Sequence, residues 1–200
     1  MGKLQEINKH AALNASRALS KLIDRPVDVR VSEARVKKVE ELASIIGPEE
    51  IVVGIHLPVT GDIEGAALLI FPEETAFTLC DLLVKREPGT TRRLSGLDRS
   101  ALKEVGNIIS GSYLAVFSNM LQVKTIEHIP SLSFDMFGAI ASQMITNFAQ
   151  KAGKALVTDI EFIFKPVALK GYFFLFFLLE QIDVVLGSLE NHRKLIKGSG

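Results

Sequence analysis

The sequence predicts an α/β fold of the α+β kind: one continuous, mostly antiparallel sheet with two long helices packed on one face. Segments in which apolar and polar residues alternate lie between segments with the spacing of amphipathic helices. The order of these segments in the first half of the chain returns in the second half. We therefore expect a pseudo-twofold domain made of two helix–strand–helix–hairpin–helix units.

The elements of the first half follow from their hydrophobic periods and from the turns between them. Valine alternates with polar residues from Val27 to Ser32, which is typical of a half-buried strand. Gly61 and Asp62 separate two apolar strands and predict a hairpin. In chain order we expect a helix over 4–22, a strand over 27–39, strands over 50–57 and 63–71, and a helix over 72–83.

The second half shows the same succession of elements. Its segment that begins at Glu104, EVGNIISGSYLAVFS, aligns with EINKHAALNASRALS, which begins at Glu6. We expect one domain over 1–200, with repeats over about 1–85 and 95–200 and a polar linker over 86–94. The expected elements are a helix over 97–121, a strand over 124–129, a helix over 134–151, strands over 155–164 and 169–179, and a helix over 181–196.

Composition excludes several classes of protein. Twenty-three basic and 23 acidic residues cancel, so the electrostatic footprint of a nucleic-acid-binding protein is absent. The longest apolar run, 172–179, is too short to cross a membrane, and the N-terminus lacks the apolar stretch of a signal peptide. A single cysteine, Cys80, excludes an internal disulfide, and its apolar surroundings predict a buried thiol. We expect a cytoplasmic protein with no membrane insertion.

Common catalytic motifs are missing from the sequence. It contains no dinucleotide-binding or phosphate-binding glycine loop, no zinc-binding HExxH or CxxC, and no GxSxG. The four histidines are scattered and no two have the spacing of metal ligands, so we expect no metal site.

One face of the helix over 97–121 is unusual in its composition. At about 100° per residue, five residues lie within roughly 60° of one another, opposite the apolar arc. They are small residues around one carboxylate and one amide: Ser100, Glu104, Asn107, Gly111 and Ser118. Because small residues let another protein approach closely, the face has the character of a docking surface. An ordinary solvated face with tolerated glycines remains the alternative.

The spacing of Ser100, Glu104, Asn107 and Pro130 resembles the signature of the CheC-type chemotaxis phosphatases. This family includes CheC, CheX and the CheC-like part of the flagellar switch protein FliY. The surrounding segment LKEVGNIISGSY is also similar to CheC sequences, as is the duplicated architecture.

The resemblance implies a phosphatase that hydrolyses the aspartyl phosphate of a CheY-type response regulator. It implies that Asn107 orients the attacking water and that Glu104 pairs with the active-site lysine of the regulator. Ser100 and Pro130 are expected to shape the helix end and the adjoining strand. The protein would need no cofactor of its own, because Mg²⁺ would be bound by the regulator.

The first repeat departs from the pattern. Glu6 matches Glu104, but Lys9 stands in the position of Asn107 and Ser32 in that of Pro130. A lysine ammonium cannot accept a hydrogen bond from water, so we expect a degenerate first site and one working site in the second repeat.

A non-catalytic binding module is the alternative function. CheC proteins also bind the deamidase CheD, and the related switch protein FliM lacks the catalytic pair. The presence of both Glu104 and Asn107 favours catalysis. Because the chain begins in the first helix and ends soon after the last one, we expect a stand-alone CheC. The resemblance offers CheD as a second candidate partner, and the sequence leaves its binding open.

Overall fold

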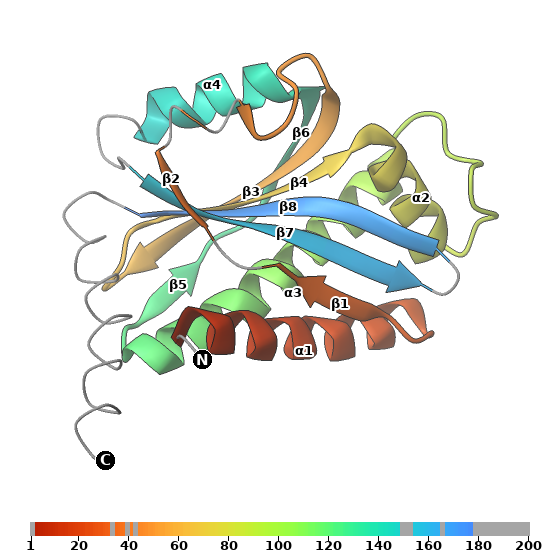
Figure 1. Cartoon of the computed structure of the whole chain (residues 1–200). Helices are drawn as coiled ribbons and strands as arrows, with labels where there is room; N and C mark the ends of the chain where they lie inside the picture. The colour runs from red at the N-terminus through yellow and green to blue at the C-terminus, as the bar shows by residue number, and fades with distance from the viewer. Residues whose placement is uncertain are drawn as a thin grey trace.

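The structure is a computed structural model that describes residues 3–32, 35–38, 41, 44–148, 154–164 and 167–177. The described residues form one eight-stranded sheet with helices on both faces (Figure 1). None of the described helices is long and apolar enough to span a membrane. The helices are α1 (Lys3–Ile23), α2 (Glu73–Leu83), α3 (Gly96–Leu121) and α4 (Phe137–Phe148). The strands are β1 (Asp28–Val31), β2 (Arg35–Lys38), β3 (Ile51–Gly61), β4 (Gly65–Pro72), β5 (Thr125–Glu127), β6 (Ser131–Met136), β7 (Lys154–Phe164) and β8 (Val167–Phe177).

The sheet has the strand order β1-β7-β8-β4-β3-β5, with β2 also paired to β7 and β6 to β3. Every pairing is antiparallel, and the hairpins β3–β4 and β7–β8 meet in the middle through β4 and β8. The strand order is symmetric between the two halves of the chain. When each of β1–β4 swaps its label with the corresponding strand of β5–β8, the order is unchanged except that it runs from the opposite edge of the sheet. The topology is the one that two repeats would produce, and the duplication itself stays a prediction.

The two long helices, α1 and α3, pack side by side on one face of the sheet, as predicted (Figure 1). The main hydrophobic core lies between them and the sheet, and α2 contributes to it. Phe71, Phe117, Phe162 and Phe173 are fully buried there. On the other face, α4 covers a second core that contains Phe137 and Phe174. The sheet therefore separates two apolar layers.

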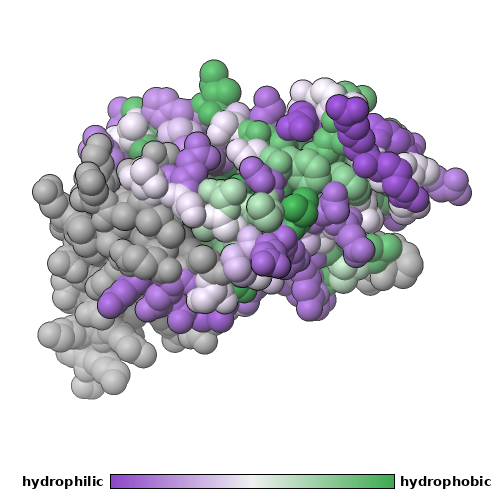
Figure 2. Space-filling view, turned by 90° about the horizontal axis from the view of Figure 1, so that it is seen from above, coloured by the Kyte–Doolittle hydropathy of each residue, from purple (hydrophilic) through white to green (hydrophobic). Residues whose placement is uncertain are grey.

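The central strands are apolar on both sides because both faces are covered. Along β8, Phe173 and Leu175 face the main core, whereas Phe174 and Phe176 face the core under α4. The phenylalanine-rich strand is thus buried on both faces. Seen from above, the surface on the α4 side mixes hydrophilic areas with hydrophobic ones (Figure 2). A polar hollow of about 410 Å³ on this face is lined in part by Asp159 and Glu161 of β7.

Two predicted elements differ from the structure. Residues 131–136 form strand β6, paired with β3, whereas the sequence analysis predicted no strand there and began a helix at residue 134; α4 begins only at Phe137. The physical reason is that apolar and polar residues alternate. Leu132 and Phe134 pack on the main core, whereas Ser131, Ser133 and Asp135, which alternate with them, are exposed. Between β2 and β3, where the repeat predicts a helix, the described residues form no α-helix. The helix predicted over 181–196 lies outside the described residues.

A glycine sets the distance between α3 and the sheet. A Cβ atom at Gly106 would lie 2.6 Å from Cγ2 of Ile55 on β3, which is closer than real side chains approach. Ile55 is itself buried in the main core. The glycine lowers helix propensity by about 1 kcal/mol, but it allows the helix to lie against the strand.

We expect the substitution Gly106→Ala to destabilise the protein, although alanine is the better helix former. Overpacking in a core costs about 1–3 kcal/mol, which exceeds the gain of about 1 kcal/mol in helix propensity. The measurement is the urea midpoint of unfolding. Gly111→Ala in the same helix is the control: its added Cβ atom would meet only the end of the exposed Glu127 side chain, so it should leave the midpoint unchanged or raise it. Equal shifts in the two variants would contradict the role given to Gly106.

Candidate functional site

Helix α3 begins at a capping box. Ser95 accepts a hydrogen bond from the backbone N–H of Asp98, and the Asp98 carboxylate accepts one from the backbone N–H of Ser95 at 2.8 Å. The Ser95 hydroxyl also donates to Asp98 Oδ2 at 2.6 Å. These bonds satisfy backbone donors that a helix start leaves open, so the first residue of α3 is well defined.

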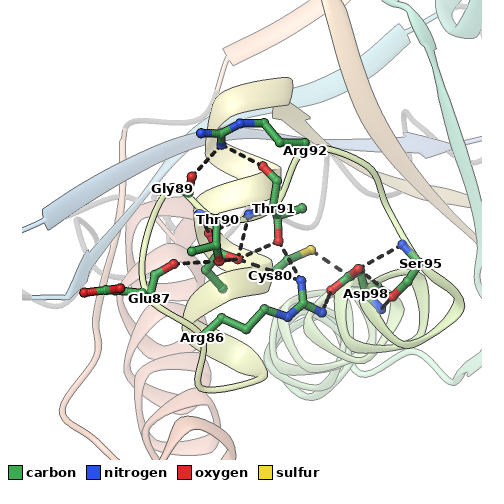
Figure 3. A network of polar contacts seen from close by, with 10 residues as sticks. Cys80, Arg86, Glu87, Gly89, Thr90, Thr91, Arg92, Ser95 and Asp98 are labelled. Atoms are coloured by element: carbon green, nitrogen blue, oxygen red, sulfur yellow. Dashed lines mark hydrogen bonds and ion pairs between the residues drawn. The ribbon is translucent and has the colours of Figure 1, made fainter.

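A buried polar network ties this start to α2 and to the segment between the helices (Figure 3). Arg86 donates to Asp98 Oδ1 at 2.6 Å and to Thr91 Oγ1 at 2.7 Å. Asp81 of α2 accepts hydrogen bonds from the backbone N–H groups and hydroxyls of Thr90 and Thr91. Segment 86–94, predicted as a linker, is therefore held between α2 and α3.

Hydrogen bonds keep both buried carboxylates of this network ionised. Burial alone raises the pKa of Asp81, but the hydrogen bonds from Thr91 and Thr90 outweigh burial and lower it below its ordinary value. Burial likewise raises the pKa of Asp98, and its bonds to Ser95 and Arg86 lower it overall. Cys80 lies nearby in the core, which confirms the predicted buried thiol, and burial raises the pKa of this thiol to about 12.

The three polar residues singled out on α3 lie at the surface. Ser100 and Glu104 are exposed, and Asn107 is partly exposed. No described residue forms a hydrogen bond or ion pair with the side chain of any of the three. The helix thus presents a carboxylate and an amide one turn apart, with their hydrogen-bonding capacity unused by the described part of the fold.

Pro130 lies in the short segment that links β5 to β6 at the sheet edge. The backbone N–H of His128 donates to the carbonyl of Pro58 on β3, and β6 resumes pairing with β3 at Ser131. Helix α3 packs on both β5 and β6. The half-buried Pro130 thus belongs to a segment fixed at both ends to the strand beneath α3.

Two further contacts show how this side of α3 meets β5. The Glu127 carboxylate lies over Gly111, where an added Cβ atom would be 3.2 Å from Oε2. Further along, the hydroxyls of Ser118 and Thr125 are 2.7 Å apart. Ser118 therefore holds α3 to β5, and the open part of the face extends from Ser100 to Gly111.

The corresponding face of α1 carries different chemistry. Glu6 and Lys9 are both exposed, and no described residue pairs with the Lys9 ammonium. Their neighbour Asn8 is buried, where it donates to the Ser32 carbonyl and accepts from the Tyr113 hydroxyl of α3, each at 2.9 Å. A groove of about 620 Å³ between α1 and β1 runs beside Lys9.

The described residues contain no group of three or more histidine, cysteine or acidic side chains that could hold a metal ion. His128 is engaged with the Thr60 hydroxyl at 2.9 Å. Burial lowers the pKa of His56 on β3, which favours its neutral form.

Sequence reasoning missed two features near the site. The spacing of Ser95 and Asp98 is readable as a helix start, but nothing local shows that Arg86 and Asp81 join it. Glu127 was also missed, because its proximity to Gly111 depends on how β5 is placed beside α3.

Comparison with known proteins shows that the chain is similar to the CheC-like family and to a CheC protein. Residues 97–130 match the model of the CheC-like family, and this stretch contains Ser100, Glu104, Asn107 and Pro130. The CheY-P phosphatase CheC of Bacillus subtilis (strain 168) is 29% identical over 162 residues, which cover 80% of this chain and 78% of that protein.

Solved structures show the same fold. FliY of Thermotoga maritima superposes with a TM-score of 0.74 at 20% identity, over 93% of each chain. CheX in a complex with CheY, BeF3 and Mg²⁺ from Borrelia burgdorferi gives a TM-score of 0.54 at 17% identity, over 86% of this chain and 97% of that chain.

The two buried carboxylates predict how stability depends on pH. Folding lowers the pKa values of both carboxyl groups. Their ionised forms therefore stabilise the fold fully above the unfolded pKa of about 3.9, and this stabilisation is lost as the pH falls through the pKa of the folded state. Asp98→Asn should lower the free energy of unfolding at pH 7 by about 1–3 kcal/mol. The variant should also lose less stability than wild type between about pH 5 and pH 2.

Urea unfolding at a series of pH values measures both effects. Glu87→Gln removes an exposed carboxylate from the same segment and should follow the wild-type curve. If the free energy of unfolding of Asp98→Asn falls with pH as steeply as that of wild type, Asp98 is not held ionised by the network.

Proposed function

Because residues 97–130 match the CheC-like family and the chain is similar to a CheC protein over most of its length, we propose that it hydrolyses the aspartyl phosphate of a phosphorylated CheY-type response regulator. The observation that carries the proposal is the pair Glu104 and Asn107 on α3. Both side chains reach the surface from a helix whose start and packing are fixed, and no described residue uses their polar atoms. The CheC relative from Bacillus subtilis, described as a CheY-P phosphatase, supports this choice of substrate.

In this proposal Asn107 orients the attacking water. The amide both donates and accepts hydrogen bonds, so it can hold a water in line with the phosphorus without changing its protonation state. An acyl phosphate is already activated, and positioning one water therefore supplies most of the required catalysis. The water oxygen forms the new bond to phosphorus, and the regulator's aspartate leaves as a carboxylate.

Glu104 acts by fixing the position of the regulator. Its carboxylate pairs with the active-site lysine of the regulator and so sets the register in which Asn107 enters the phosphorylated pocket. Ser100, one turn earlier, is small and leaves Glu104 accessible from the side of the helix start. Pro130 stiffens the segment between β5 and β6, beside which α3 packs.

The chemistry on this protein needs no cofactor of its own. The Mg²⁺ is bound by the regulator and travels with the substrate, a view supported by the presence of Mg²⁺ in the related CheX–CheY complex. The first-repeat pair Glu6 and Lys9 contributes no second active site, because a lysine ammonium cannot accept a hydrogen bond from the water. The cytoplasmic location rests on this function, since such regulators act there.

The decay of phosphorylated CheY tests the proposal. Wild-type protein should accelerate the decay, and Asn107→Ala should slow the catalysed decay on the order of 10²-fold, or about 2.7 kcal/mol of barrier. Lys9→Ala, at the matching position of α1, is the control and should keep the wild-type rate. The regulator should bind the wild-type protein and Asn107→Ala alike.

Two results would overturn parts of this proposal. Binding of the regulator without any acceleration of its decay would identify a non-catalytic adaptor, whose partners would then include CheD. A large loss of activity in Lys9→Ala would show that the first repeat is also catalytic.

The charge of Glu104 is tested by a separate variant. Glu104→Gln keeps the shape of the side chain but removes the charge that pairs with the regulator's lysine. We expect weaker binding of the regulator and slower decay, with a smaller difference from wild type at high salt. An unchanged affinity at low salt would rule out the proposed pairing.

A further inference from the structure

The side chain of Glu127 on β5 lies over Gly111, where α3 has no side chain of its own. Gly111 has no side chain, and an added Cβ atom there would lie 3.2 Å from Glu127 Oε2 and 3.5 Å from Oε1. Both carboxylate oxygens are therefore close to the helix surface at this glycine. A larger residue at position 111 would fill the space that the carboxylate uses.

This position is in line with the proposed site. Gly111 follows Asn107 by four residues and Glu104 by seven, so all three lie on one stripe of the helix. Along the helix axis, Glu104 and Asn107 are about 4.5 Å apart, and Asn107 and Gly111 are about 6 Å apart. Asn107 thus lies between two carboxylates, Glu104 from its own helix and Glu127 from the neighbouring strand.

The Glu127 carboxylate is not neutralised by the described part of the fold. No described residue forms an ion pair or hydrogen bond with it. Glu127 is exposed, and its partial burial against α3 raises the pKa of this carboxyl above its ordinary value. An exposed carboxylate without an ion-pair partner in the described fold can receive a basic group from another protein.

The same segment carries an unusually exposed apolar residue. Ile129 is 88% exposed, two residues after Glu127 and directly before Pro130. Contacts of α3 place this segment beside the open face, because Thr125 adjoins Ser118 and Glu127 adjoins Gly111. A carboxylate and an isoleucine open to solvent beside the proposed site are the side chains that a protein partner would cover.

We propose that Glu127 is a docking residue for the phosphorylated response regulator and that it receives a lysine or arginine side chain from the regulator's surface. This inference rests on the proposed function, because it takes the regulator to be the protein that covers the α3 face. Glu127 fixes the orientation of the bound regulator together with Glu104. It takes no part in the chemical step, because it lies one turn away from Asn107 on the side opposite to Glu104.

The test measures binding separately from hydrolysis. A CheY-type regulator activated with beryllium fluoride and Mg²⁺ is titrated with wild type, Glu127→Gln and Glu127→Lys. We expect the dissociation constant to rise about 3–10-fold for Glu127→Gln and further for Glu127→Lys, with smaller changes at 0.5 M salt. In the decay assay, Glu127→Gln should raise KM and leave kcat unchanged.

Glu49 provides the matched control. It is exposed in the turn before β3. This turn contacts the start of α4, which lies on the face of the sheet opposite to α3. Glu49→Gln and Glu49→Lys should bind the regulator as wild type does. The inference is wrong if Glu127→Lys binds the regulator as tightly as Glu49→Lys, or if Glu127→Gln lowers kcat with KM unchanged.

The binding arm also separates this inference from the phosphatase proposal. If the protein binds the activated regulator through Glu127 but does not accelerate decay, docking stands and catalysis fails. If Asn107→Ala abolishes catalysis while both Glu127 variants bind normally, catalysis stands and the docking role of Glu127 fails.

Discussion

The close approach of α3 to β3 at Gly106 is the constraint on which the functional surface depends. A helix has one rotation about its axis at which its buried residues fit the sheet, and Gly106 against Ile55 selects that rotation. With Gly106 facing the strand, the stripe of Ser100, Glu104 and Asn107 must face outward. The exposure of the proposed site therefore follows from a packing contact on the opposite side of the helix.

Both ends of α3 are fixed by polar contacts that complement this packing. At the start, Arg86 bridges Asp98 to the segment that Asp81 holds. Near the end, Ser118 meets Thr125 of β5. A helix held at both ends and along its length presents its surface groups with little freedom, which is what positioning a single water requires.

The sequence predicted the elements whose pattern is local and long. Helix α3 was predicted over 97–121 and observed from Gly96 to Leu121, because 26 residues of helical periodicity outweigh two glycines. Strand β6 was missed because its six residues carry only a short alternation next to a true helix. The exposed stripe on α3 was predictable for the same reason, since helical spacing alone decides which residues share a face.

What the sequence could not predict depends on contacts between distant segments. Glu127 reaches Gly111 only because β5 pairs with β3 beneath α3. Arg86 and Asp81 looked like parts of a linker and a helix, and their burial with Asp98 appears only when α2 and α3 are packed. Charged residues in such networks have no periodic signal that distinguishes them from solvated ones.

The two halves also keep one structural contact while they differ in chemistry. Ser20 of α1 accepts a hydrogen bond from the backbone of Val27, and Ser118 of α3 meets Thr125, with the same separation in sequence in both pairs. This shared tie between a helix end and the next strand supports the two-repeat hypothesis.

The same alignment gives the physical basis for proposing a single active site in the second half. It places Leu13, which is 47% exposed, at the position of Gly111. It also places the buried Val29 at the position of Glu127 and Lys9 at that of Asn107. A bulky apolar side chain and an ammonium group replace the open glycine and the amide, so neither the room for a second carboxylate nor the acceptor for a water is present. The proposed functional asymmetry thus lies in surface side chains, which can differ between the halves without changing the fold.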